Sequence, residues 1–116
     1  GTLPKDTDIT LIQAVTTNGT PWGEVEFRRN GMLYRAYTGM KRINAMGTFA
    51  QGDNSYYDAV LSQPQSAYYG PGYQYALRKG APAPGTPLRV FRVENGFYQV
   101  DYQSGSSWVR AWLPGI

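Results

Sequence analysis

The sequence predicts an all-β protein of many short strands, with little or no helix. Tyrosine, tryptophan and phenylalanine make up 15% of the 116 residues, and aromatic side chains favour strands. Fourteen glycines and eight prolines interrupt the chain every few residues, so it lacks the long runs of alanine, leucine and charged residues that helical bundles need. Hydrophobic residues reach 41%, which suffices for one small domain or for two small units that share a core.

Three strands are predicted in the first third of the chain. Residues 9–15 are rich in β-branched side chains, whereas residues 22–27 and 32–38 alternate polar and apolar side chains as half-buried strands do. Asn-Gly pairs at 18–19 and 30–31 separate these strands, and this dipeptide readily adopts the positive φ angles of a tight turn. The pattern therefore predicts three strands joined by hairpin turns.

Three strands of the same kind are predicted in the second half. They cover residues 88–93, 97–102 and 108–113, and the turns between them lie at 94–96 and 103–107. The order of strands and turns is that of the first half.

An internal repeat relates the two sets of strands. A shift of 75 residues aligns 25–27 with 100–102 and 34–37 with 109–112, so that both copies contain Val-acid-aromatic and later Arg-Ala-aromatic. Hairpins with alternating valine and tyrosine resemble one another by chance, but here order, register and turn positions agree together. We therefore expect two copies of one strand–loop–hairpin unit.

The chain between the two copies is less regular. Residues 44–57 are turn-rich and are predicted to be a linker, residues 57–62 form a short strand or one helical turn, and the proline-rich residues 80–87 form a loop. This division gives a first unit over residues 1–43 and a second over residues 58–116.

Five short motifs of the second half follow one another in a recognisable order. They are Ala-Val-Leu at 59–61, Tyr-Gly-Pro-Gly-Tyr-Gln-Tyr at 69–75, Gly-Thr-Pro-Leu-Arg-Val at 85–90, Glu-Asn-Gly-Phe-Tyr-Gln-Val at 94–100 and Trp-Val at 108–109. Together they resemble the pattern of the bacterial SH3 (SH3b) domain family. The resemblance implies tandem SH3-like small barrels, of which the second is complete and the first, over residues 5–43, is partial.

The partial unit leaves a sheet edge to be covered. An SH3-like barrel has about five strands, whereas the first unit supplies only three or four, and an unpaired edge invites association with another strand. We expect residues 48–51 or 56–61 of the same chain to cover this edge, which gives a monomer. The alternative is a homodimer in which two molecules exchange these strands.

The predicted core consists of the inward-facing side chains of both units. They are Leu11, Val25, Phe27, Tyr34 and Ala36 in the first unit, and Leu88, Val90, Val100, Tyr102, Val109 and Ala111 in the second. Because alternation places Glu24 and Glu26 on the opposite face from Val25, we expect these two carboxylates on a solvated outer face.

Composition and motifs exclude most catalytic sites. The absence of histidine and cysteine excludes the usual zinc sites, thiol nucleophiles, histidine-based triads and disulfides. The aspartates do not have the spacing of a calcium loop, and the Gly-Pro-Gly at 70–72 is not followed by the Lys-Ser/Thr of a phosphate loop. We therefore expect no enzyme, no metal and no cofactor.

Charge and hydropathy limit the partners. The net charge of +3 is not concentrated in the lysine and arginine clusters that nucleic-acid binding requires, and no apolar run is long enough to span a membrane.

Aromatic side chains carry the one predicted site. Four tyrosines crowd residues 68–75, and the last strand alternates Trp108, Arg110 and Trp112 on one face against Val109 and Ala111 on the other. We expect the Trp/Arg face to be at least partly exposed, with Trp112 exposed and Trp108 either exposed or plugging the barrel end. The predicted ligand-binding residues line an open groove beside residues 70–72; they are Tyr69, Tyr73, Tyr75, Trp108, Arg110 and Trp112.

Three functions are compatible with these features. The SH3b resemblance implies a non-catalytic binding module, secreted or in the cell envelope of a bacterium, that recognises peptidoglycan or its stem peptides. A protein–protein interaction domain that binds an extended or Pro-rich peptide is the first alternative. A structural spacer in a secreted protein is the second.

Overall fold

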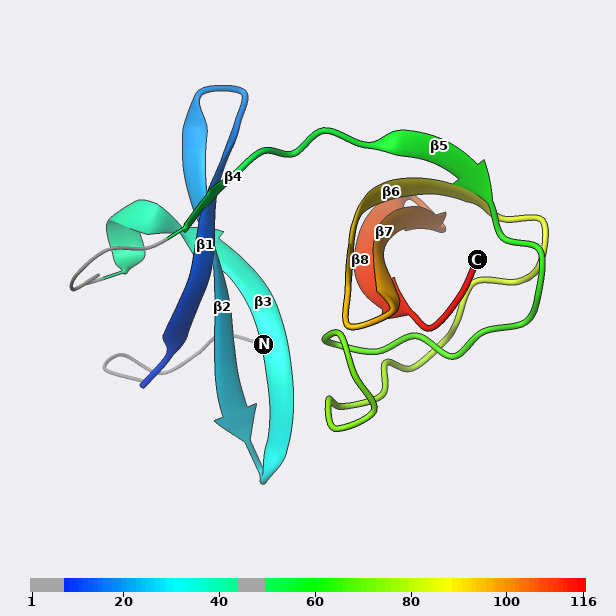
Figure 1. Cartoon of the computed structure of the whole chain (residues 1–116), viewed down its shortest axis with the longest axis horizontal. Helices are drawn as coiled ribbons and strands as arrows, with labels where there is room; N and C mark the ends of the chain where they lie inside the picture. Colours follow the sequence, from blue (N-terminus) through cyan, green and yellow to red (C-terminus); the bar gives the residue numbers. More distant parts are fainter. Residues whose placement is uncertain (1–7, 44–49) are drawn as a thin grey trace.

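Two four-stranded sheets, one from each half of the chain, form the protein (Figure 1). The computed structural model describes residues 8–43 and 50–116. The strands are β1 (Thr10–Thr17), β2 (Thr20–Arg29), β3 (Met32–Gly39) and β4 (Ala50–Gly52) in the first sheet, and β5 (Tyr57–Val60), β6 (Pro87–Glu94), β7 (Phe97–Ser104) and β8 (Ser107–Leu113) in the second. Within the described residues the only helical segment is the 3-10 turn η1 (Met40–Arg42), so the all-β prediction is confirmed.

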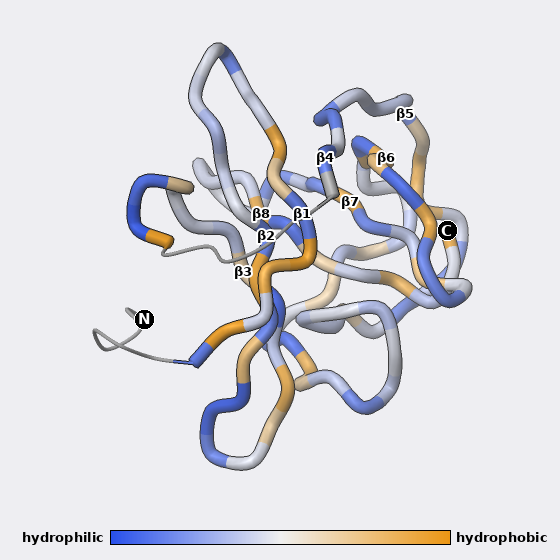
Figure 2. Tube along the Cα trace, turned by 60° about the vertical axis from the view of Figure 1, so that its left-hand side comes forward, coloured by the Kyte–Doolittle hydropathy of each residue, from blue (hydrophilic) through white to orange (hydrophobic). Residues whose placement is uncertain are grey.

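The three predicted Asn-Gly turns are present. Asn18, Asn30 and Asn95 have φ angles of 51°, 52° and 54°, and the glycine after each has a φ of 79°. These left-handed angles are the ones that two-residue hairpin turns require, and asparagine and glycine adopt them at little cost. In Figure 2 most hydrophobic segments lie within strands, and the turns between strands are mostly hydrophilic.

Both sheets repeat one strand order, although the fourth strand is parallel to its neighbour in the first sheet and antiparallel in the second. Read from the last strand of each hairpin, the orders are β3-β2-β1-β4 and β8-β7-β6-β5. In both hairpins the repeated valine lies opposite the repeated alanine. A β-bulge lies at the same place in each unit, immediately before the pairs Gln13–Glu24 and Arg92–Gln99. Gln13 and Arg92 therefore occupy equivalent positions, although the first hairpin extends two residues further on each strand before its Asn-Gly turn.

The free edge of the first unit is covered from within the chain. β4 pairs in parallel with β1, with Ala14 opposite Gln51 and Val15 opposite Gly52. β4 overlaps the first of the two segments expected to cover this edge, residues 48–51, and ends one residue beyond it at Gly52. Thr48 and Phe49 of that segment lie outside the described residues. The second segment serves the other unit, because β5 pairs antiparallel with β6.

The second unit has the better-defined core. Five of the residues predicted there are in its buried cluster: Leu88, Val90, Val100, Tyr102 and Ala111. Leu61, Ala67 and Leu113 complete the cluster. Val109 is partly buried and packs against this cluster.

The first unit buries less. Val25 is buried, and the other predicted core residues Leu11, Phe27 and Tyr34 are only partly buried. The prediction for Ala36 is wrong, because this side chain is exposed. Ala36 shares a face with Val25, but β3 is the last strand on its side of the sheet, whereas Val25 lies on β2, which has a strand on both sides.

The long loop before β6 joins the two sheets. The N–H of Arg35 on β3 donates to the carbonyl of Tyr69, and the N–H of Ala76 donates to the carbonyl of Leu33, both at 2.9 Å. On its other side the loop forms two backbone hydrogen bonds with β8 through Tyr68. The loop thus pairs with the outer strand of each hairpin, which leaves neither edge bare at these residues.

Replacing Gly70 by alanine should destabilise the protein. A Cβ at Gly70 would overlap the buried ring of Tyr75, whereas Gly39, at a φ of −61°, has no other atom within 4 Å of the corresponding position. We expect Gly70→Ala to lower the free energy of unfolding in urea by about 1–3 kcal/mol. The control Gly39→Ala should change it by less than about 0.5 kcal/mol. Equal stability of the two variants would contradict this packing.

Candidate functional site

A buried carboxylate lies between the two sheets. The side chain of Glu24 on β2 is 0% exposed, and Arg92 on β6 donates from Nη2 to its Oε1 at 2.5 Å. Gln13 Nε2 donates to the same oxygen at 3.2 Å, and Gln99 Nε2 donates to Oε2, also at 3.2 Å. A buried charge is tolerated only when a partner and hydrogen bonds replace water, and Glu24 has both.

A second ion-pair cluster continues the interface. Arg35 on β3 donates to Glu26 at 3.0 Å and to both carboxylate oxygens of Glu94 at 2.9 and 3.1 Å. Burial alone would lower the pKa of Arg35, but hydrogen bonds to Glu94 and Glu26 outweigh it and raise that pKa above its usual value. The hydroxyl of Tyr75 donates to Glu26 at 2.5 Å and ties the long loop to this cluster.

The interface is approximately symmetric about the internal repeat. Glu24 and Gln99, which hydrogen-bond to each other, are 75 residues apart and so occupy equivalent positions. Two equivalent arginine–aromatic contacts cross the interface: Arg110 over Tyr37 at 4.9 Å and Arg35 over Trp112 at 5.8 Å from guanidinium carbon to ring centroid. Each unit thus presents the same face to the other, as subunits do in a twofold dimer.

The predicted solvated face of the glutamates is wrong. Glu24 is fully buried and Glu26 is partly buried, because the second unit covers this face of β2. The register itself is correct, since Val25 is also buried on the opposite face. The internal repeat offered a clue that this face is buried. The position of Glu24 is polar in both copies, and large aromatic residues lie near it in each.

The residues predicted to bind ligand do not form one site. The exposure predicted for Trp112 is wrong, because this residue is 3% exposed and its ring lies under the guanidinium groups of Arg35 and Arg92. Tyr75 is also buried, and its ring fills the space beside Gly70, where we expected an opening.

Exposure is confined to two of the six predicted residues. Tyr73 is 71% exposed and Trp108 is 48% exposed, and they lie in separate regions: Tyr73 packs edge-on against Phe97 at the start of β7, whereas Trp108 lies near the start of β8. Tyr69 is partly buried under the guanidinium of Arg78, 4.4 Å from its ring centroid. Arg110 is partly buried and donates to both carboxylate oxygens of Asp101, at 2.8 and 3.1 Å.

An aromatic–arginine platform surrounds Trp108. The guanidinium of Arg89 on β6 lies 4.0 Å from the ring centroid of Trp108 and 5.1 Å from that of Tyr56, just before β5. We refer to Tyr56, Arg89 and Trp108 as the platform. The ring of Phe91 continues it, 5.6 Å from Tyr56 and 3.9 Å from the guanidinium of Arg110. Sequence reasoning missed Tyr56 and Arg89, although alternation in residues 88–93 already placed Arg89 opposite the inward-facing Leu88 and Val90.

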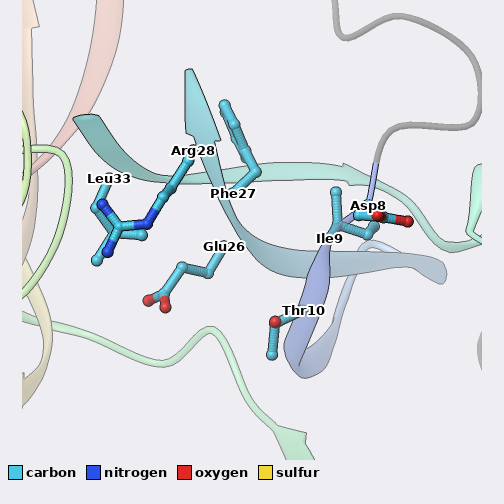
Figure 3. Close-up of a pocket in the computed structure, with 7 residues that line it drawn as sticks. All are labelled: Asp8, Ile9, Thr10, Glu26, Phe27, Arg28 and Leu33. Atoms are coloured by element: carbon cyan, nitrogen blue, oxygen red, sulfur yellow. The ribbon is translucent and has the colours of Figure 1, made fainter. Parts of the chain in front are cut away.

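The first unit has a pocket where the second has the platform. This shallow pocket of about 390 Å³ is lined by Thr10, Glu26 and Leu33, among others (Figure 3). Thr10 pairs with Glu26 as Arg89 pairs with Asp101, and Leu33 is the repeat equivalent of Trp108. The two units therefore carry different chemistry at one equivalent position.

Several other kinds of site find no support in the described ranges 8–43 and 50–116. No group of three acidic residues there could hold a metal ion. None of the helical segments within these ranges is long and apolar enough to cross a membrane. The chain matches no protein-family model, no curated protein and no solved structure.

Removing the cation beside Glu24 should destabilise the interface strongly. Arg92→Met leaves a buried carboxylate without its charged partner, so the free energy of unfolding should fall by about 3–5 kcal/mol. Adding Glu24→Gln removes the uncompensated charge while an amide remains beside Gln13 and Gln99, and should restore at least half of the loss. A double-mutant cycle measures this coupling. A double variant no more stable than Arg92→Met would contradict the claim that Arg92 compensates the buried charge of Glu24.

Stability should decrease between about pH 10 and pH 12. Burial and the hydrogen bond to Glu26 raise the pKa of Tyr75 to about 12. The unfolded chain loses this proton near pH 10, whereas the folded chain keeps it to a higher pH, so the stabilisation is complete below pH 10 and is lost as pH rises to about 12. Chemical unfolding across this range should show a shallower decrease for Tyr75→Phe than for the wild type. The exposed-ring control Tyr73→Phe should follow the wild type, and equal slopes for all three would contradict the prediction.

Proposed function

We propose that the protein is a non-catalytic binding module of the bacterial cell envelope that recognises peptidoglycan or its stem peptides. The observation that carries the proposal is the half-exposed ring of Trp108 stacked on the guanidinium of Arg89. The proposal places the protein in the secreted or cell-envelope fraction and treats both units as SH3b-like, in line with the motifs of residues 58–116. It treats the chain as a monomer, in line with the pairing of β4 with β1.

The surroundings of Trp108 support a binding role. Its backbone is fixed in the β7–β8 ladder opposite Gln103, and its ring is held by Arg89, so the ring needs little ordering before it meets a ligand. A flat aromatic face next to a cation suits both parts of peptidoglycan: apolar sugar faces stack on rings, and peptide carboxylates pair with arginine.

The ionic groups of the interface support a non-catalytic role. Glu24, Glu26 and Glu94 are each bound by an arginine at the junction of the two sheets. Carboxylates held in this way stabilise structure and are poorly placed to transfer protons to a ligand.

Recognition of an extended or Pro-rich peptide is the second candidate. It is favoured by the exposed ring of Tyr73, which packs edge-on against Tyr68 and Phe97 at centroid distances of 5.5 and 5.0 Å. Such aromatic clusters are typical of surfaces that bind polyproline conformations.

Co-sedimentation with purified peptidoglycan tests the proposal. The wild type should pellet with the sacculi, and Trp108→Ala should weaken binding about tenfold or more without unfolding the protein, because a stacked tryptophan is a typical energetic centre of an interface. The matched control is Trp22→Ala, which removes a similarly exposed tryptophan from the first unit.

Two results would contradict it. One is the absence of wild-type protein from the pellet, and the other is equal loss of binding in Trp108→Ala and Trp22→Ala. If Tyr73→Ala alone abolished binding to a Pro-rich peptide while sacculi were ignored, the second candidate would replace the first.

A further inference from the structure

We propose that the platform is a carboxylate-binding site, in which Arg89 binds a free carboxylate of the stem peptide and Trp108 contacts the apolar group next to it. This inference rests on the proposed function for the source of the carboxylate.

Stacking leaves the hydrogen-bonding edge of Arg89 available. The guanidinium carbon lies over the rings of Trp108 and Tyr56, at 4.0 and 5.1 Å from their centroids. Within the described residues the guanidinium of Arg89 forms no hydrogen bond or ion pair, so its five N–H donors remain available to a ligand. A carboxylate binds the planar fork of an arginine with two parallel hydrogen bonds, and the ring contacts of Arg89 leave those donors free for it.

The charge of Arg89 is unpaired within the described residues. Arg35, Arg92 and Arg110 each form an ion pair, but Arg89 has no carboxylate within 4.0 Å. Asp101 lies opposite Arg89 on β7, yet it is occupied by Arg110.

The other neighbouring acid does not neutralise Arg89. Asp58 lies opposite it on β5, is exposed and forms no ion pair with it. A partly buried arginine that keeps its charge without a partner is suited to bind an anionic group from outside.

The first unit indicates that this arrangement is not required by the fold. Its equivalent residues are Thr10 and Leu33, which lie beside Glu26 in the shallow pocket of Figure 3. The same strands thus form in that unit without an arginine at the position of Arg89 or a tryptophan at that of Trp108. Because threonine and leucine replace the arginine and the tryptophan in the first unit, we place the site in the second unit.

Calorimetric titration of the full chain with two soluble probes tests the site. One probe is a synthetic stem tetrapeptide with free carboxylates, and the other is the same peptide with every carboxylate amidated. Wild type should bind the free acid about tenfold more tightly, because a hydrogen-bonded ion pair in a partly desolvated site is lost on amidation. Arg89→Gln should bind both probes equally weakly, and Arg42→Gln, which removes the same charge from η1, should behave as wild type.

A second variant keeps the test decisive if Arg89→Gln does not fold. Arg89→Lys keeps the charge but loses the planar fork, so it should retain part of the preference for the free acid. Thermal unfolding of both Arg89 variants provides the check on the fold. Should Arg89→Gln fail to fold, the preference measured in Arg89→Lys decides the question alone, and an undiminished preference would overturn the role of Arg89.

The remaining outcomes separate this inference from the proposed function. Sedimentation with sacculi together with equal wild-type affinity for the two probes would overturn the carboxylate site and leave the proposed function standing. A preference for the free acid without sedimentation would support the site and contradict peptidoglycan as its source. Failure of both assays would overturn both.

Discussion

The buried ion pair between Glu24 and Arg92 is the interaction on which the arrangement of the two sheets depends. It joins the centre of β2 to β6, and its remaining hydrogen bonds come from one glutamine in each unit, Gln13 and Gln99. A desolvated carboxylate is costly unless every partner is in place, so only a narrow range of relative positions satisfies it. Apolar contacts alone would allow the sheets to slide. The polar interface therefore specifies how the units meet, and the Cα radius of gyration of 14.3 Å is close to the roughly 13 Å of one compact domain of this length.

The outer face of the second sheet has one end that packs against the first unit and another end that stays open. Gln99 and Trp112 are buried at the first end, where they meet the face of the first unit that carries Glu24. Trp108 is four residues away along β8, about 13 Å in a strand, and its side chain stays half-exposed. The interface thus determines which part of the face stays open to a ligand.

The sequence predicted the strands well and the relation between the units poorly. Alternation and Asn-Gly turns depend on neighbours in the chain, so they located the strands and the core of the second unit correctly. What covers a face depends on distant segments, and for that reason Glu24 and Trp112 were assigned to solvent. Arg89 and Tyr56 come together through the β5–β6 pairing, 33 residues apart in the chain, and no local pattern marks that contact.

Chemical-shift mapping by NMR tests the central claim, that the open end of the second unit's outer face binds the ligand. Uniformly ¹⁵N-labelled protein would be titrated with soluble peptidoglycan fragments produced by digestion of sacculi. The account predicts that the indole N–H of Trp108 and the side-chain and backbone signals of Arg89 shift together, while signals of Gln13 and Gln99 at the interface stay in place. Shifts confined to the loop around Tyr73 or to the first unit would contradict it.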